Sequence, residues 1–114
     1  MITIYHNPRC SKSRQTLALL EEQGIAPEIV LYLQTPPDKA TVLALLDKLD
    51  ISARELLRKG EAAYKENNLK SDKLSDDELV EYMVKYPALI ERPIVVNGSK
   101  AALGRPPEAV LSIL

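Results

Sequence analysis

One stretch decides the fold of this chain, and it reads YHNPRCSKSRQTLALL over residues 5–20. Residues 1–5 just before it alternate apolar and polar side chains, a pattern that predicts a short half-buried strand. Asn7-Pro8 then predicts a turn, because the residue before a proline avoids the helical conformation. Residues 11–23 contain no helix breaker, so a helix is expected there. Cys10 is therefore predicted to lie where a strand turns into a helix.

Cys10 is the only cysteine, and its neighbours indicate a reactive thiol. The backbone N–H groups at the start of a helix lack partners and the helix dipole is positive there, so an anion is stabilised. Arg9, Lys12 and Arg14 add positive charge. Such surroundings lower the pKa of a thiol and favour the thiolate, which is the nucleophilic form. The alternative is a small buried hydrophobic residue, as free cysteines commonly are, but the polar flanks argue against it.

The composition is that of an ordinary globular domain. The chain has 114 residues, enough to bury a core, and we expect a single domain over residues 1–114. The net charge of −1 gives no sign of a nucleic-acid or membrane partner. One cysteine forms no internal disulfide, and no signal peptide or membrane span is evident, so we expect a cytoplasmic monomer. One Cys and one His are too few for a zinc site, so no metal is expected.

The chain beyond the first helix predicts the order β-α-β, a helical block, and then β-β-α. A second strand is expected over residues 28–33, after Gly24 ends the first helix. Thr35 is expected to cap the next helix. Asn97-Gly98 lies between two apolar runs and predicts a hairpin turn. The last helix is expected to begin at Pro106.

Within the predicted helices, apolar residues at helical spacing are expected to face the core, and capping boxes are expected at Ser52 and Ser75. The core-facing residues are Leu17, Ala18 and Leu20; Val42, Leu45, Leu46 and Leu49; Leu79, Val80, Met83 and Val84; and Val110, Leu111 and Leu114.

This order predicts an α/β protein, with a thioredoxin-like mixed sheet, flanking helices and a helical insertion. In that fold the redox cysteine lies at the first strand-to-helix junction, where Cys10 is expected. The fold also keeps a cis proline beside that cysteine, so we expect a cis bond between Arg92 and Pro93. These are analogies of fold, and a fold alone assigns no function.

Three further arginines are candidate ligands for an oxyanion. Arg92 and Arg105 each lie at an end of a predicted hairpin strand, beside a proline that stiffens the backbone. A guanidinium fork binds a tetrahedral oxyanion at two points, which lysine does not. Arg58 lies at the end of a short predicted helix, where an arginine is ordinarily a surface residue that balances the helix dipole.

Five motifs taken together resemble the glutaredoxin-coupled arsenate reductase family, and in particular its chromosomal members. They are HNPRCSKSR (6–14), LYL (31–33), LLRK (56–59), ERPIV (91–95) and GRPPE (104–108). The resemblance covers nearly the whole chain and implies a thioredoxin-like fold. It implies that Cys10 is catalytic and that Arg58, Arg92 and Arg105 hold the oxyanion. Residues expected to support the site are His6, Ser13, Arg14 and Pro93, with His6 either beside the thiolate or a satisfied core residue.

The resemblance implies the reduction of arsenate, or of a similar oxyanion, through a Cys10–arsenic intermediate. Because a second cysteine is absent, an outside thiol must complete the reaction, and glutathione and a glutaredoxin are the expected partners, with glutathione as reductant and no bound cofactor. A cysteine phosphatase is excluded because its loop has five residues between Cys and Arg, whereas three separate Cys10 from Arg14. Ser13 excludes a Cys-x-x-Cys oxidoreductase. A monothiol oxidoreductase acting on glutathione mixed disulfides and a regulator that binds RNA polymerase stay open.

Overall fold

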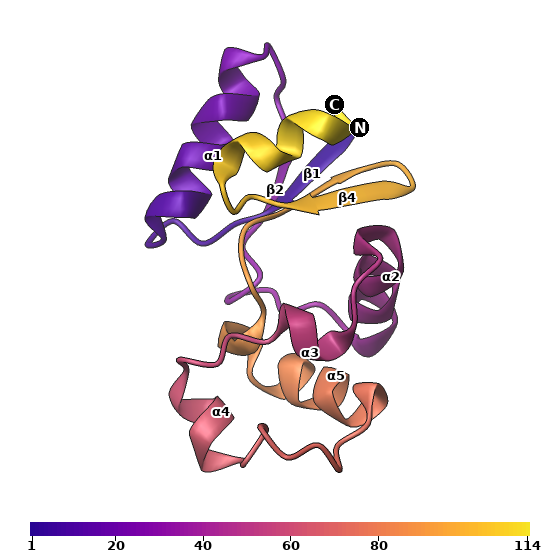
Figure 1. Cartoon of the computed structure of the whole chain (residues 1–114). Coiled ribbons are helices and arrows are strands. Elements are labelled where there is room, and N and C mark those ends of the chain that lie inside the picture. The colour runs from indigo at the N-terminus through magenta and orange to yellow at the C-terminus, as the bar shows by residue number, and fades with distance from the viewer. The chain divides into compact units, whose positions relative to one another are not determined.

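The structure is a computed structural model that describes all 114 residues, and the chain forms two compact units (Figure 1). The first unit joins the two ends of the chain, Met1–Thr35 and Arg92–Leu114. The second unit is the segment between them, Pro36–Glu91. The single domain expected over residues 1–114 stays a prediction.

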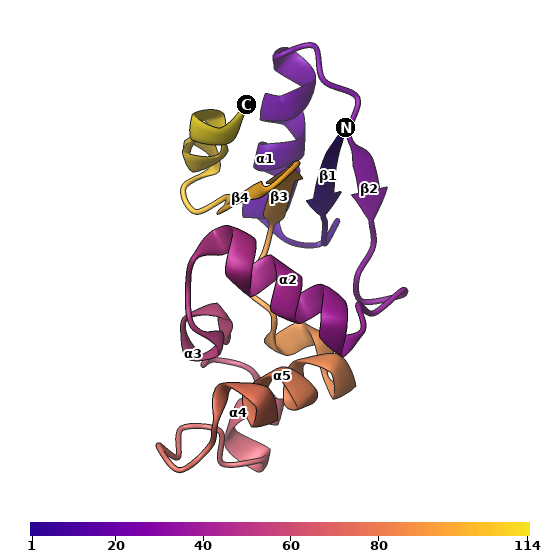
Figure 2. The same ribbon diagram turned by 90° about the vertical axis from the view of Figure 1, so that its right-hand side faces the viewer.

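The first unit is built on a four-stranded mixed sheet. Its strands are β1 (Ile2–Tyr5), β2 (Glu28–Val30), β3 (Ile94–Asn97) and β4 (Lys100–Leu103). Their order across the sheet is β2-β1-β3-β4, as Figure 2 shows from the side. β1 runs parallel to β2 and antiparallel to β3, and β3 runs antiparallel to β4. The predicted β-α-β unit and the predicted β-β hairpin are both confirmed.

One face of this sheet is covered by the helices α1 (Ser11–Glu22) and η2 (Pro107–Ile113), which lie side by side in Figure 1. The core between them consists of Ile4, Leu20, Val95 and Val110, all fully buried. This packing ties the two ends of the chain into one hydrophobic cluster, because the four residues come from β1, α1, β3 and η2.

The last helix differs from its prediction. It is a 3₁₀ helix, and two of the residues expected in its core face, Leu111 and Leu114, are each 41% exposed. A 3₁₀ helix has three residues per turn, so the α-helical spacing used for the prediction does not hold there. Val110 is buried as predicted.

The buried face of α1 also differs from its prediction. Its buried residues are Ser13, Thr16 and Leu20, whereas Leu17 is half-buried and Ala18 is exposed. Two small polar side chains therefore occupy the core side of the first two turns. The apolar pattern of the sequence predicted the wrong buried face of α1, because that pattern counts only apolar residues and not Ser13 or Thr16.

Two turns are placed differently from the sequence prediction. β2 ends at Val30, and the N–H groups of Gln34 and Thr35 both donate to the Leu31 carbonyl (2.9 Å each), so residues 31–35 form a turn where more strand was expected. In the hairpin, Asn97 pairs with Lys100, which makes Gly98-Ser99 the loop. Gly98 has φ +63°, as the first residue of such a two-residue loop requires.

The second unit is wholly helical, and it is the helical insertion that the sequence predicts. Its helices are α2 (Lys39–Leu49), α3 (Ala53–Leu56), α4 (Ala62–Glu66), α5 (Asp76–Lys85) and the 3₁₀ turn η1 (Pro87–Leu89). α5 packs against α2, α3 and η1. The buried hydrophobic residues are Val42, Leu45, Leu46, Ala53, Leu56, Leu57, Leu69, Leu79, Val80, Met83, Leu89 and Ile90. No helix in the protein is long and apolar enough to cross a membrane.

The helix caps of the second unit follow the sequence in part. Ser75 makes the full predicted capping box with Glu78. Ser52 makes one half of its box, accepting the N–H of Glu55. The cap of α2 is Asp38, whose side chain accepts the N–H of Thr41 (2.8 Å), and the predicted cap at Thr35 is wrong. Asp38 prevails because the two preceding residues are prolines, which hold the chain extended up to it.

We expect Ser75→Ala to lower the free energy of unfolding by about 1 kcal/mol, because it removes the hydroxyl that accepts the Glu78 N–H. Urea unfolding followed by circular dichroism measures this. Ser99→Ala, an exposed residue of the hairpin loop, is the control and should change the free energy by less than about 0.5 kcal/mol. Equal effects of the two substitutions would contradict the capping assignment.

Candidate functional site

Four loops meet at one end of the sheet in the first unit. The register places Val30, Tyr5, Ile94 and Leu103 in one row across the four strands. Because β3 runs opposite to its neighbours, its entry lies at the same end as the exits of β1, β2 and β4. Every candidate site residue of the first unit lies in one of these loops or in the first turns of α1.

Cys10 is the N-cap of α1, as predicted. Its backbone is extended (φ −95°, ψ 122°), its carbonyl accepts the N–H of Arg14 (3.0 Å), and its own N–H donates to the Asn7 carbonyl (3.0 Å). The Asn7 side chain accepts the N–H of Arg9 (3.0 Å), an Asx turn that fixes the loop ahead of the helix. The half-buried thiol therefore lies at the open N–H groups of the first turn of α1.

Burial raises the pKa of the Cys10 thiol, but hydrogen bonds to the sulfur outweigh that effect. The backbone N–H of Ser13 and the guanidinium of Arg92 contribute most to lowering the pKa, and the N–H of Lys12 adds to them. The net result is a pKa below the ordinary value of a thiol. This combination of a helix N-terminus and a cation is typical of nucleophilic cysteines.

Arg92 and Arg105 reach the Cys10 sulfur from two different loops. Arg92 precedes β3, and its guanidinium is near enough to the sulfur to lower the pKa of the thiol by hydrogen bonding and by charge. Arg105 follows β4; its Nη2 lies 3.9 Å from the sulfur and its Nε donates to the Arg92 carbonyl (2.9 Å). Two guanidinium groups beside one thiolate form a site suited to an anion with several oxygens.

Two peptide bonds next to these arginines are cis. The bond between Arg92 and Pro93 is cis, which confirms the prediction. The bond between Arg105 and Pro106 is also cis, and the sequence analysis did not predict it.

His6 and Ser13 support the loop from inside the first unit. His6 is only 6% exposed, and its Nδ1 lies 2.6 Å from Ser13 Oγ, which also accepts the N–H of Asn7 (3.0 Å). Burial, and then the charge of Arg14, lowers the pKa of His6. His6 is thus a buried residue that meets the cysteine loop through Ser13, whose own backbone N–H is directed at the sulfur.

The cations expected around the thiolate act differently from the prediction. Arg9, Lys12 and Arg14 are all exposed, and the cation that lowers the pKa of Cys10 is Arg92. Arg14 instead donates to the Pro8 carbonyl (2.9 Å), which braces the loop. Proximity in sequence was a poor guide here, because the side chains next to Cys10 in the chain are exposed to solvent, whereas the pairing of β3 with β1 brings Arg92 to the sulfur.

Arg58 belongs to the second unit, where its guanidinium pairs with two carboxylates. Nη1 lies 2.9 Å from Glu91 Oε1, and Nε lies 3.3 Å from Glu61 Oε1. The Arg58 N–H donates to the Leu89 carbonyl (2.8 Å), which fixes the backbone beside η1. The expected role as a surface residue balancing the dipole of α3 does not describe it, since α3 ends two residues earlier and the guanidinium is held by Glu61 and Glu91.

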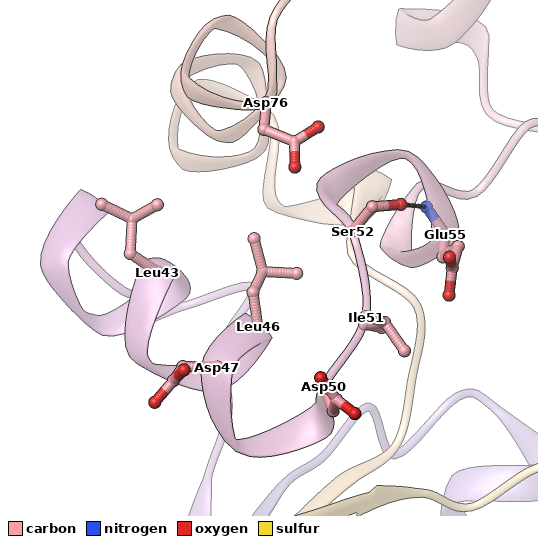
Figure 3. A pocket seen from close by; sticks show the side chains of 8 residues that line it. All are labelled: Leu43, Leu46, Asp47, Asp50, Ile51, Ser52, Glu55 and Asp76. Atoms are coloured by element: carbon pink, nitrogen blue, oxygen red, sulfur yellow. Dashed lines mark hydrogen bonds between the residues drawn. The ribbon is translucent and has the colours of Figure 1, made fainter.

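A cavity of about 520 Å³ in the second unit is unsuited to an anion. Figure 3 shows that carboxylates surround it, from Asp47, Asp50, Glu55 and Asp76. These charges repel an oxyanion. The arginines beside Cys10 therefore make the better candidate for an oxyanion site.

Gly104 is a site residue that the sequence analysis missed. A Cβ there would overlap Thr16 Oγ1 and would lie 2.6 Å from Pro93 Cγ. The Gly104 N–H donates to the Pro93 carbonyl (2.9 Å), and Thr16 Oγ1 donates to the Lys12 carbonyl (2.8 Å). This close approach places Arg105, the next residue, beside Cys10. Glycine before Arg-Pro was the available signal, since glycine marks close backbone approach.

Comparison with known proteins agrees with this geometry. The sequence profile of the ArsC family matches residues 5–113. The chain belongs to the ArsC family. It is 58% identical over 114 residues to the uncharacterized protein YfgD of Escherichia coli (strain K12), covering 99% of this chain and 96% of that protein. It is 49% identical over 113 residues to an arsenate reductase of Escherichia coli, covering 99% of this chain and 80% of that protein.

A solved structure supports the same assignment. The arsenate reductase from Vibrio cholerae matches this ArsC chain with a TM-score of 0.97 and 53% identity, covering 99% of this chain and 97% of that one. The predicted thioredoxin-like fold and the resemblance to arsenate reductases are thereby confirmed.

We expect alkylation of Cys10 by iodoacetamide to rise with pH around a midpoint below about 8.5, the ordinary value for a thiol. Because a lowered pKa lets Cys10 stay in the thiolate form at lower pH, the midpoint of the alkylation rate measures how far the site stabilises the thiolate. Arg92→Gln removes the cation and should move the midpoint up, whereas Lys100→Gln, an exposed lysine of β4, should leave it unchanged. A parent midpoint at or above about 8.5 would contradict the assignment.

We expect Gly104→Ala to lower the free energy of unfolding by about 1–3 kcal/mol, because neither Thr16 nor Pro93 can yield to the added methyl group. The shift of the backbone should also carry Arg105 away from the sulfur. Gly60→Ala is the matched control, since no atom lies within 4 Å of the position of its Cβ. Urea unfolding measures both variants, and equal stability of the two would show that the close approach at Gly104 is unimportant.

Proposed function

We propose that this protein reduces arsenate, or a similar oxyanion, with Cys10 as the nucleophile and Arg92, Arg105 and Arg58 as ligands of the oxyanion. The observation that carries the proposal is the placement of two guanidinium groups beside a thiol of lowered pKa at a helix N-terminus. The arsenate reductases among its relatives support the same activity.

Nucleophilic attack explains how such a site would act on arsenate rather than phosphate. The two oxyanions have similar charge and shape, so arginines alone bind both. The Cys10 thiolate attacks arsenic, an As–S bond forms, and an oxygen leaves as water after protonation. The guanidinium groups orient the oxyanion and offset its charge as the thiolate approaches.

Arg58 is included as the third ligand because it lies in the LLRK motif of the family resemblance. Its guanidinium pairs with Glu61 and Glu91, and an oxyanion that used it would compete with these carboxylates. Such competition favours a doubly charged oxyanion over a singly charged one.

The reduction step needs two electrons, and Cys10 alone cannot supply them. We propose that glutathione attacks the adduct, so that arsenic(V) leaves as arsenite and Cys10 forms a mixed disulfide with glutathione. A second thiol, from glutathione or a glutaredoxin, then releases Cys10 as a thiolate by thiol exchange. The balance is one arsenate and two thiols in, and one arsenite, one disulfide and one water out. We propose that this takes place in the cytoplasm, where such thiols stay reduced.

The deciding experiment is arsenate-dependent oxidation of NADPH in the presence of glutathione, glutaredoxin and glutathione reductase. The reductase hypothesis requires turnover that is lost in Cys10→Ser. A monothiol oxidoreductase would act on glutathione mixed disulfides without needing the arginines, and a regulator would show no turnover of arsenate. Absence of arsenate turnover in the parent protein would overturn the proposal.

We expect Arg92→Lys and Arg105→Lys each to reduce arsenate-dependent turnover by about tenfold to a hundredfold, since a charge-assisted contact contributes roughly 1.5–3 kcal/mol. Lysine keeps the charge but loses the two-point fork. Arg54→Lys is the control, because the Arg54 guanidinium donates to the carbonyls of Leu69 and Ser71 (2.9 and 2.8 Å) within the second unit. If turnover is unimpaired in both active-site variants, the arginines do not hold the oxyanion.

A further inference from the structure

The outside thiol needs a place to bind near Cys10, and the arginines occupy one side of the cysteine loop. Arg92 and Arg105 come from the entry of β3 and the exit of β4. β1 lies between β3 and β2 in the sheet. The loop that follows β1 therefore has the arginines on the side of β3 and has its opposite side toward β2. The thiol and the oxyanion can therefore approach the loop from different sides.

A cavity of about 240 Å³ lies on the β2 side of this loop. Its walls come from the segment just before Cys10, including His6, Pro8 and Arg9, and from the turn after β2, including Leu31 and Leu33. Leu33 is 43% exposed, so its apolar surface is available to a ligand in the cavity. The volume is below the range of about 300–1,000 Å³ that is usual for small-molecule pockets, so the cavity suits only part of a small peptide.

The chemistry of the walls favours a ligand that carries a negative charge and also has an apolar portion. Arg9 is exposed, and its guanidinium makes no hydrogen bond or ion pair within the protein. Ser13 Oγ accepts the N–H of Asn7 and lies 2.6 Å from His6 Nδ1, which holds the cavity wall in place. Arg9 offers N–H donors to a carboxylate, and Leu31 and Leu33 offer apolar surface.

We propose that this cavity is the binding site of the thiol that reduces the Cys10 intermediate, and that it takes a small peptide thiol with free carboxylates, of the glutathione class. Arg9 binds a carboxylate of the peptide, and the thiol of the peptide reaches the sulfur of Cys10, the residue next to Arg9. The inference rests on the proposed function for its biological role, but the binding itself can be tested without arsenate.

The test uses thiol–disulfide exchange at Cys10 with two disulfides. The Cys10 thiolate attacks one sulfur of glutathione disulfide, the S–S bond of that disulfide breaks, a Cys10–glutathione disulfide forms, and glutathione leaves as a thiolate. Bis(2-hydroxyethyl) disulfide undergoes the same exchange but carries no carboxylate. Mass spectrometry of the full chain gives both second-order rate constants. Their ratio reports recognition of glutathione, because changes in the reactivity of the Cys10 thiolate largely cancel.

We expect Arg9→Ala to lower this ratio by up to about fivefold, because Arg9 is exposed and an ion pair at an exposed site is weakened by solvent. Arg9→Lys should keep most of the ratio. Leu33→Glu, which adds a negative charge to the same wall, should lower it at least as much as Arg9→Ala. Lys100→Ala removes an exposed positive charge of β4 and should leave the ratio unchanged. In the arsenate assay, Arg9→Ala should raise the KM for glutathione and leave the KM for arsenate unchanged.

A ratio within twofold of the parent value in both Arg9→Ala and Leu33→Glu would overturn the proposal. An equal fall in Lys100→Ala would do so too, because it would show a general effect of charge. If the rate of exchange at Cys10 depended on Arg9 only when glutaredoxin was the thiol donor, the cavity would bind a protein partner and not a small thiol. That result would also overturn the proposal. Absence of arsenate turnover with the ratios as expected would refute the proposed function and leave the thiol site standing.

Discussion

The first turn of α1 offers backbone N–H groups that no carbonyl of the helix accepts, and the Cys10 sulfur is placed to accept them. This constraint fixes the position of the chemistry, since a thiolate buried to the same extent elsewhere in the unit would lack these donors. The loop before the helix is built to serve it: Asn7 holds the turn and Ser13 ties the turn to His6. The rigid backbone of α1 thereby holds these N–H donors at the sulfur in fixed positions, whereas donors on a flexible side chain would lose conformational freedom on making the same contact.

The sheet register extends this arrangement to the arginines. β3 enters and β4 leaves the sheet at the end where α1 begins, so Arg92 and Arg105 reach the sulfur from residues more than 80 positions away in the chain. Arg105 also donates to the Arg92 carbonyl, so the position of the Arg105 guanidinium depends on the backbone of the loop before β3. An oxyanion site of this kind is specified by strand pairing as much as by the arginines themselves.

Much of this could be predicted from the sequence because the signals are local. The breaker-free helix after Cys10, the capping box at Ser75 and the order of strands all depend on neighbouring residues. The failures have a common cause in tertiary context. The buried face of α1 carries Ser13 and Thr16 because the loops after β1 and β4 approach it closely, and the cation that acts on Cys10 is Arg92 because of long-range strand pairing. Spacing along the chain encodes neither of these contacts.

The close approach of Gly104 to Thr16 and Pro93 has a consequence for how this sequence can vary. The three positions lie just after β4, on α1 and in the loop before β3, and together they share one fixed volume. Interiors are packed as densely as organic crystals, so a larger residue at one of them requires a smaller one at another. Positions 16, 93 and 104 are therefore expected to covary among related sequences, although they lie on separate segments and only neighbouring residues of theirs touch the thiolate.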